Sequence, residues 1–311
     1  MRSNELDGIK GILIIGVVII HSRFTYLEGI HPFIDGLIKI LDPAVMAFFL
    51  INGFLSAKSR KKGAKMIQKS AQLFLMGFGW SLAYYLIFVA LGRVELSLRG
   101  VIFSSMEGPA FQMYFLVYLS GLGVVFGVAR WLKFERFLPF VLFAGAVALY
   151  LVSDRPLIGH GSSGLPFYIS AYAIGLLGSR MREVVGFPKA SAFGVLAVAF
   201  VGAALSVDGV IRPFVSLAFL LLGVLLYPPK LGRVDLLAGI GLSSLWIYLL
   251  HTPILAPAVF RGVNLLVGID GLTWTLGLGG TVAVCLFAHR AWGLVSQRLR
   301  AVGKIRRQIS S

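Results

Sequence analysis

The chain has 311 residues, of which 58% are hydrophobic and only 14% are charged, and its mean hydropathy is +0.87. This composition is too apolar for a soluble globular protein of that length and indicates an integral membrane protein in a lipid bilayer. The formal net charge of +16 is spread over short loops that would face anionic lipid headgroups, so we expect no nucleic-acid partner.

Apolar runs of about 15 to 23 residues recur along the sequence, and a helix of that length, rising about 1.5 Å per residue, crosses the hydrocarbon core. We therefore predict an all-α integral membrane fold, a polytopic bundle of about ten transmembrane helices. The predicted spans are 8–26, 33–57, 70–91, 111–129, 137–153, 166–179, 190–207, 211–227, 236–258 and 272–289. Because no long polar segment separates them, residues 1–311 are predicted to form a single integral-membrane domain.

Basic residues lie mainly on one side of the predicted bundle. If the ten spans are taken as they stand, 21 of the 29 basic residues fall at the two ends or in the even-numbered connections, and Lys10 lies near the start of the first span. The positive-inside rule then places both termini in the cytoplasm. Residues 290–311 would form a basic cytoplasmic tail, and the expected location is the inner (plasma) membrane.

The first predicted span carries ionisable groups, which are costly in a bilayer. Lys10 and His21 are eleven residues apart, so they share one helix face and lie about 16.5 Å apart along the axis. Asp7 lies on the same face, fourteen residues before His21. The structural alternatives are snorkelling of Lys10 to the interface and a hydrogen-bonded packing role for His21.

The second predicted span contains Asp35, Lys39 and Asp42 at spacings i, i+4 and i+7. In a continuous helix these side chains share one face and would line a wet cavity. Alternatively, Asp42 is an N-cap with Pro43 at the first helical position, and residues 33–41 form a separate segment at the outer surface. The sequence leaves both interpretations open.

Two further stretches are noteworthy. The loop KSRKKGAKMIQK, residues 58–69, is the densest run of charge, and a topology signal with headgroup contact is its simplest explanation. His251 lies in SSLWIYLLHTPIL near the outer end of the ninth predicted span, where a hydrogen bond to a carbonyl freed by the following proline is the simplest explanation. Cys285 is the only cysteine, so no internal disulfide can form and no metal site is expected.

Five motifs, in order, make the chain similar to a known family. The first, LDGIKGILIIGVVIIH, contains Lys10, ten intervening residues and His21. The others are FFLINGFLSAKSRKK, QMYFL at 112–116, LPFYISAYAIGLLGSR and SLWIYLLHTPIL. With these motifs the chain resembles the integral-membrane acyltransferase family 3, whose members acylate surface sugars and related acceptors.

The resemblance implies a cytoplasmic acyl-coenzyme A donor, expected to be acetyl-coenzyme A, and a carbohydrate or glycolipid acceptor beyond the membrane. The protein would then be an acyl-CoA-dependent O-acyltransferase of cell-envelope material such as exopolysaccharide. His21 is the expected general base, because histidine has an unperturbed pKa near neutrality. Asp42 or Asp7 would orient it, and the sequence does not choose between them. Direct transfer and an acyl-histidine relay both remain open.

Lys10, with Arg60, Lys61 and Lys62 of the basic loop, is expected to hold the phosphates of coenzyme A. The expected acceptor-binding residues are Asp35, Lys39, Asn52, Gln112, Tyr114 and His251. Three of these, at positions 52, 112 and 114, depart from the residues usual in the family, which leaves the acceptor open. The alternative function is a transporter or flippase for a lipid-linked sugar or small anion, with the polar stripe as a proton relay. The oligomeric state, including a homo-oligomer, is also open.

Overall fold

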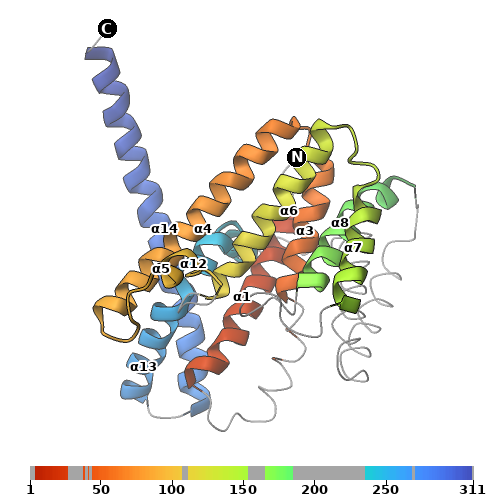
Figure 1. Ribbon diagram of the computed structural model, residues 1–311. Coiled ribbons are helices and arrows are strands. Elements are labelled where there is room, and N and C mark those ends of the chain that lie inside the picture. The colour runs from red at the N-terminus through yellow and green to blue at the C-terminus, as the bar shows by residue number, and fades with distance from the viewer. Residues whose placement is uncertain are drawn as a thin grey trace. The chain divides into compact units, whose positions relative to one another are not determined.

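The structure is a computed structural model, shown as ribbons in Figure 1. It describes residues 4–26, 38, 41, 44–106, 111–152, 165–184, 235–267 and 270–309. Every element in these ranges is a helix, and none of the residues in them forms a strand. This confirms the all-α part of the predicted fold.

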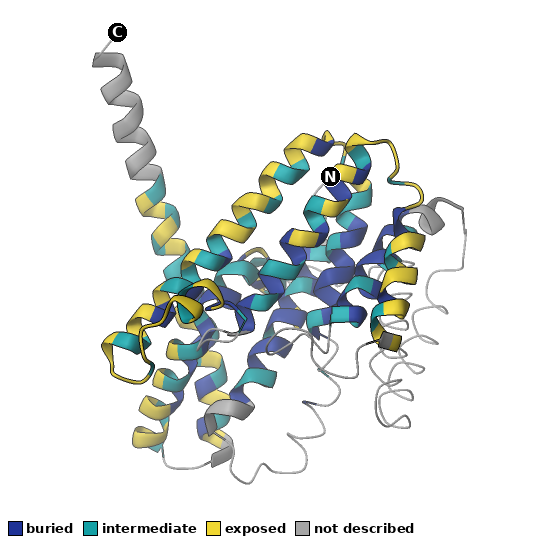
Figure 2. Ribbon diagram, in the orientation of Figure 1, coloured by how far each residue is buried: buried dark blue, intermediate teal, exposed yellow. Residues whose placement is uncertain are grey.

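Several of the described helices are suited to a membrane. Those long and apolar enough to cross one are Gly63–Ala90, Tyr114–Trp131, Ser244–Val267 and Leu272–Ser296. Large apolar side chains such as Phe140 and Leu151 are exposed, as expected of a surface that faces lipid. Figure 2 shows how buried and exposed residues are distributed over the helices. The spans predicted at 190–207 and 211–227 lie outside the described residues, and the cytoplasmic placement of both termini stays a prediction.

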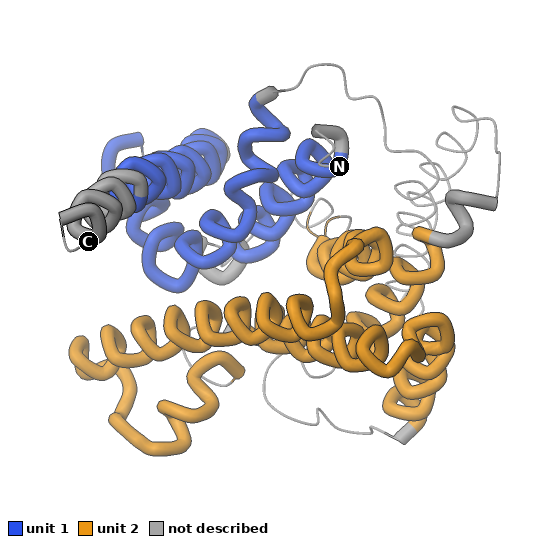
Figure 3. The backbone as a smooth tube through the Cα atoms, turned by 90° about the horizontal axis from the view of Figure 1, so that it is seen from above, with its two compact units in different colours: residues 1–30, 233–311 blue, residues 31–232 orange. Residues whose placement is uncertain are grey.

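The chain forms two compact units, coloured blue and orange in Figure 3. Unit 1 combines the two ends of the chain, residues 1–30 and 233–311, whereas unit 2 comprises residues 31–232. Unit 1 therefore depends on long-range pairing between the first helix and the last third of the sequence.

Unit 2 contains a tightly packed helix pair, α3 (Ala44–Lys58) and α8 (Leu165–Val184). A methyl group on Gly53 would overlap the carbonyl oxygen of Tyr172, and Gly175 makes the reciprocal close approach to α3. Helices pack in membranes through small residues of this kind, because lipid tails give apolar side chains little reason to associate.

The other helices of unit 2 pack around this pair or on each other. They are α4 (Gly63–Ala90), α5 (Leu98–Ile102), η1 (Phe111–Met113), α6 (Tyr114–Trp131) and α7 (Leu138–Val152). α4 runs along α6, and α7 runs along α8. Ser97 caps α5, since its side chain accepts a hydrogen bond from the amide of Gly100.

Unit 1 gathers its helices around the N-terminal one. They are α1 (Asn4–Tyr26), α11 (Asp235–Leu242), α12 (Ser244–Leu250), η3 (His251–Leu255), α13 (Ala256–Val267) and α14 (Asp270–Ile309). α1 packs along α11 and α12, and α13 packs on α14. Apolar side chains of α1 such as Ile14, Val17 and Val18 are buried.

Two glycines bring the backbones of α1 and α11 into contact. A methyl group on Gly241 would overlap the carbonyl oxygen of Asp7, and one on Gly11 would overlap that of Leu237. No other residue type fits at either position without separating the helices, so this contact fixes how far α11 is shifted along α1.

The prediction of one continuous helix over 236–258 is wrong. Ser243 forms a turn between α11 and α12, and a π-helical turn begins at His251. Within it, Thr252 is extended, with φ −128° and ψ 159°, because the residue before a proline is disfavoured in the helical region. The helix then resumes and ends at Val267.

The last helix is longer than the span predicted at 272–289. α14 is one helix of 40 residues that ends at Ile309. Most of the predicted basic tail, residues 290–311, is therefore a helical extension of the last span.

We predict that Gly241→Ala destabilises the protein and that Gly239→Ala, two residues away on α11, does not. A methyl group at position 241 would overlap the backbone of Asp7, and overpacking of this kind costs about 1–3 kcal/mol. At position 239 nothing lies within 4 Å of an added methyl group. Thermal unfolding in detergent should show a lower Tm for Gly241→Ala alone. Equal Tm values for the two variants would contradict the close contact of α1 with α11.

Candidate active site

Two histidines from opposite ends of the chain meet in unit 1. Nε2 of His251, the first residue of η3, lies 3.3 Å from Nδ1 of His21 on α1. The ring centroids are 5.0 Å apart, with an angle of 71° between the ring planes. His251 is completely buried, while His21 is partly exposed. A pair of ionisable side chains inside apolar helices is costly, which is why such residues usually mark functional sites.

The shift of α11 along α1 explains why the two rings meet. Gly11 and Gly241 mark the closest approach of the backbones, and each histidine follows its own glycine by ten residues. Ten residues correspond to about 15 Å of rise in an α-helix. Because α12 also packs on α1, the two helical segments run in the same direction. His21 and His251 therefore lie at the same level.

Backbone carbonyls determine where His251 carries its proton. Its Nδ1 lies 2.9 Å from the carbonyl oxygens of both Ile247 and Tyr248. Carbonyl oxygens only accept hydrogen bonds, so Nδ1 bears the hydrogen and donates it. In the neutral ring Nε2 then has a lone pair, and it faces His21 as an acceptor.

The same reasoning places the proton of His21 on Nδ1. That nitrogen lies 2.9 Å from the carbonyl oxygen of Val17 and 3.3 Å from the acceptor nitrogen of His251. An unprotonated Nδ1 would face two lone pairs, whereas an Nδ1–H group donates to both. The lone pair of His21 is therefore on Nε2, the form in which an imidazole takes a proton from a hydroxyl.

A hydrogen bond beside His21 ties α14 to α1. Nε1 of Trp274 donates to Oγ of Ser22 over 3.1 Å, and Oγ of Ser22 donates to the carbonyl oxygen of Ile19 over 2.7 Å. Ser22 is buried and directly follows the histidine. The segment of α1 that carries His21 is thus held by α14 as well as by η3.

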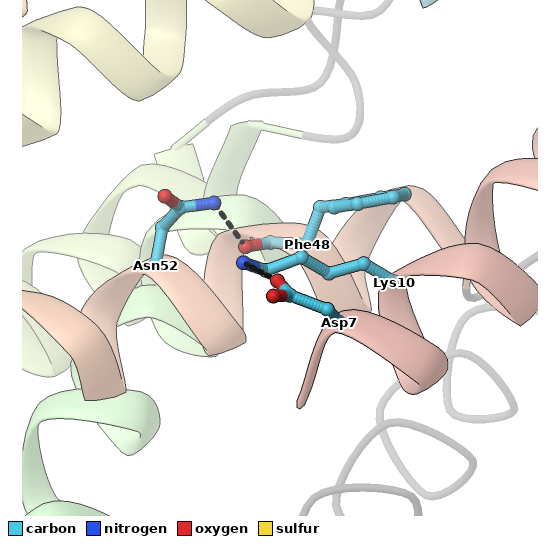
Figure 4. Close-up of polar contacts among 4 residues, drawn as sticks. All are labelled: Asp7, Lys10, Phe48 and Asn52. Carbon is cyan, nitrogen blue, oxygen red and sulfur yellow. Dashed lines mark hydrogen bonds and ion pairs between the residues drawn. The ribbon is translucent and has the colours of Figure 1, made fainter. Parts of the chain in front are cut away.

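Asp7 and Lys10 form an ion pair one turn apart at the other end of α1, as Figure 4 shows. Nζ of Lys10 donates to Oδ1 of Asp7 over 3.3 Å. Since α1 is one helix from Asn4 to Tyr26, fourteen residues separate Asp7 from His21 by about 21 Å. Asp7 therefore does not orient the His21 ring, although both lie on one helix face.

The candidate acceptor-binding residues of unit 2 make contacts within that unit. Nδ2 of Asn52 donates to the carbonyl oxygen of Phe48 over 2.8 Å (Figure 4). The hydroxyls of Tyr114 and Tyr168 are 3.0 Å apart and share a hydrogen bond. Gln112, in η1 just before α6, is almost fully buried. All three lie in or beside helices whose aromatic side chains, among them Phe49, Phe115 and Tyr168, pack on one another.

Three of the predicted site residues, Asp35, Lys39 and Asp42, lie outside the described residues. In the part of the chain that is described, no group of three or more His, Cys, Asp or Glu side chains is arranged to hold a metal ion.

The basic loop between α3 and α4 is organised by an arginine that the sequence analysis did not single out. Arg130, near the end of α6, donates to the carbonyl oxygens of Ser59 and Lys61, the latter over 3.1 Å, and approaches the last carbonyls of α3. Its guanidinium also lies 4.7 Å from the ring centroid of Phe126. A cation at a helix C-terminus is favourable, but nothing in the sequence distinguishes this arginine from other loop arginines.

Within that loop, Arg60, Lys61 and Lys62 are exposed, and Lys61 belongs to a crowded group of cations. Lys61, Lys65 and Lys69 follow one another every four residues, a spacing that puts the last two on one face of α4. A hydrogen bond from the Lys69 side chain lowers the pKa of Lys61, and burial and the charges of Lys69 and Lys65 act in the same direction. A negatively charged ligand would relieve this repulsion.

Comparison with protein-family models gives a match over residues 3–290 to acyltransferase family 3, described as an acyltransferase domain. The chain belongs to acyltransferase family 3. The match covers nearly all of the sequence and includes both histidines, which confirms the resemblance inferred from the five motifs. No curated protein and no solved structure matched the chain. Family membership and the apolar helices make the protein a membrane acyltransferase.

In this acyltransferase, we predict that Arg130→Gln loosens the basic loop. Removing charge-assisted hydrogen bonds to several carbonyls should cost about 1.5–3 kcal/mol. Trypsin should then cut faster after Arg60, Lys61 or Lys62, and the Tm should fall. Arg290→Gln, a change to an exposed arginine of α14, serves as the control. If both variants resist trypsin as well as the wild type does, Arg130 does not hold the loop.

Proposed function

We propose that the protein transfers an acyl group, most simply acetyl, from cytoplasmic acyl-coenzyme A to a hydroxyl of an extracytoplasmic carbohydrate or glycolipid in the inner membrane. His21 is the general base. The observation that carries this proposal is the hydrogen-bond pattern around His21, which leaves the lone pair on Nε2. Membership of an acyltransferase family supports the reaction class.

The chemical step needs a base, and His21 provides one. Nε2 takes the proton of the acceptor hydroxyl while the oxygen attacks the thioester carbonyl carbon and the C–O bond forms. The tetrahedral intermediate then collapses, the C–S bond breaks, and the proton on Nε2 goes to the departing coenzyme A sulfur. The histidine returns to its starting state, so no residue is consumed.

The donor's charged end would lie toward the cytoplasmic end of α1. Lys10 has three N–H donors, and its contact with Asp7 uses one of them. Lys10 and His21 are about 16.5 Å apart by helix rise, which is comparable with an extended pantetheine arm. The crowded cations of the basic loop are also suited to bind phosphate groups, which would offset their repulsion.

We predict that His21→Gln abolishes most of the acyl transfer without unfolding the protein. Glutamine keeps a polar side chain of similar size but cannot accept the proton, so turnover should fall by roughly 10²- to 10⁴-fold. The measurement is transfer from acetyl-coenzyme A by purified protein at saturating donor, with Tm recorded alongside. Near-normal turnover in a folded His21→Gln protein would remove His21 from the mechanism, and a wild type that transfers no acyl group would favour a transporter.

We also predict that replacing Arg60, Lys61 and Lys62 by glutamine raises the KM for acyl-coenzyme A severalfold and leaves kcat nearly unchanged. The contribution is electrostatic, so added salt should raise the wild-type KM more than that of the triple variant. Arg93→Gln with Arg99→Gln, two arginines of another loop region, is the control. If the triple variant has an unchanged KM for acyl-coenzyme A at low salt, the loop does not bind the donor and acts only as a topology signal.

A further inference from the structure

We infer that His251 is the positioning residue of the reaction: its Nε2 accepts the Nδ1–H of His21 and stabilises His21 as it becomes charged. This inference rests on the proposed function, because it assigns to His251 the role that a carboxylate has in other acyl-transfer sites. Of the two candidate carboxylates, Asp7 is about 21 Å away along α1 and Asp42 lies outside the described residues, whereas the ring of His251 is in contact with His21.

The geometry suits His251 to act as an acceptor. Its Nδ1–H is directed to the carbonyls of Ile247 and Tyr248, 2.9 Å away, so the lone pair is on the nitrogen that faces His21. The ring is completely buried and follows directly on α12, and the π-turn and extended Thr252 come next. The helix is therefore kinked directly after His251.

The chemistry favours a neutral partner at this depth. When His21 takes the hydroxyl proton, its Nδ1–H becomes part of a cation, and the bond to His251 becomes charge-assisted and stronger. A carboxylate in the same place would be an uncompensated buried charge as long as His21 is neutral, and such a charge is strongly disfavoured away from water. An imidazole whose proton is fixed by two carbonyls is a strong acceptor without that cost.

A packing role for His251 accounts for its bonds to Ile247 and Tyr248 but does not require an acceptor toward His21. The two roles can be separated by two substitutions. The oxygen of His251→Gln reaches the position of Nε2 and still accepts from His21, whereas the shorter His251→Asn keeps a donor near the carbonyls and loses that acceptor.

At saturating acetyl-coenzyme A, His251→Asn should therefore lower turnover by roughly 10²-fold, with His251→Gln retaining activity within about tenfold of the wild type. The KM for acetyl-coenzyme A should change less than about twofold in both. Wild-type turnover in His251→Asn, or equal losses in the two variants at equal Tm, would overturn the positioning role.

A spectroscopic test does not depend on activity, and it uses variants only to assign resonances. The wild-type protein, with its five histidines labelled with ¹⁵N in the ring, is measured by solid-state NMR in lipid, where protonated and unprotonated ring nitrogens are well separated. The resonances of His21 and His251 are assigned by their loss in His21→Gln and His251→Gln.

We expect Nδ1–H in both rings and a through-space correlation from the Nδ1–H of His21 to Nε2 of His251. A His251 ring protonated on Nε2 would overturn the inference. Loss of transfer in His21→Gln combined with full transfer in His251→Asn would overturn it while leaving the proposed function in place. A wild type without transfer activity would refute the proposed function, and the NMR correlation would still decide whether the hydrogen-bonded pair exists.

Discussion

Contact between the backbones of α1 and α11 at Gly11 and Gly241 is the constraint on which the candidate site depends. Backbones that touch cannot slide past one another without a clash, so the contact fixes the register of the two helices. Each histidine follows its glycine by ten residues. A shift by even one residue, about 1.5 Å, would break a hydrogen bond between the two rings.

The hydrogen-bond chain through the two rings begins at the backbone. The carbonyls of Tyr248 and Ile247 fix the Nδ1–H of His251, and Nε2 of His251 in turn faces Nδ1 of His21. In this arrangement the contact between the two rings needs no carboxylate. A proton acceptor can thus be placed among apolar helices without burying an unpaired charge, which would be strongly disfavoured there.

The sequence indicated both histidines but not their contact. Helix periodicity put Asp7 and His21 on one face, and because α1 is one continuous helix the rise of about 1.5 Å per residue keeps them apart. Pairing between helices depends on which small residues touch, and Gly11 and Gly241 are two among 37 glycines. Arg130 was missed for a related reason, because its partners are backbone carbonyls that any sequence supplies.

The fold was predictable in class and less so in detail. Composition predicted an all-helical chain because a bilayer requires every backbone group to be satisfied within a helix. Hydropathy averaged over a window did not predict the break at Thr252, since the residues on both sides are equally apolar. The clearest local sign was the following proline, which restricts the preceding residue to extended conformations.

Unit 1 contains the beginning and the end of the chain, which has a consequence for biosynthesis. The ribosome delivers α1 first, and α11 and η3 follow only after all of unit 2 has been made. During that interval the face of α1 that will receive α11 has no native partner, and His21 cannot yet have its ring neighbour. If His21 acts as proposed, the nascent protein cannot transfer acyl groups until α11 and η3 have inserted beside α1, and a chain that terminates early never becomes active.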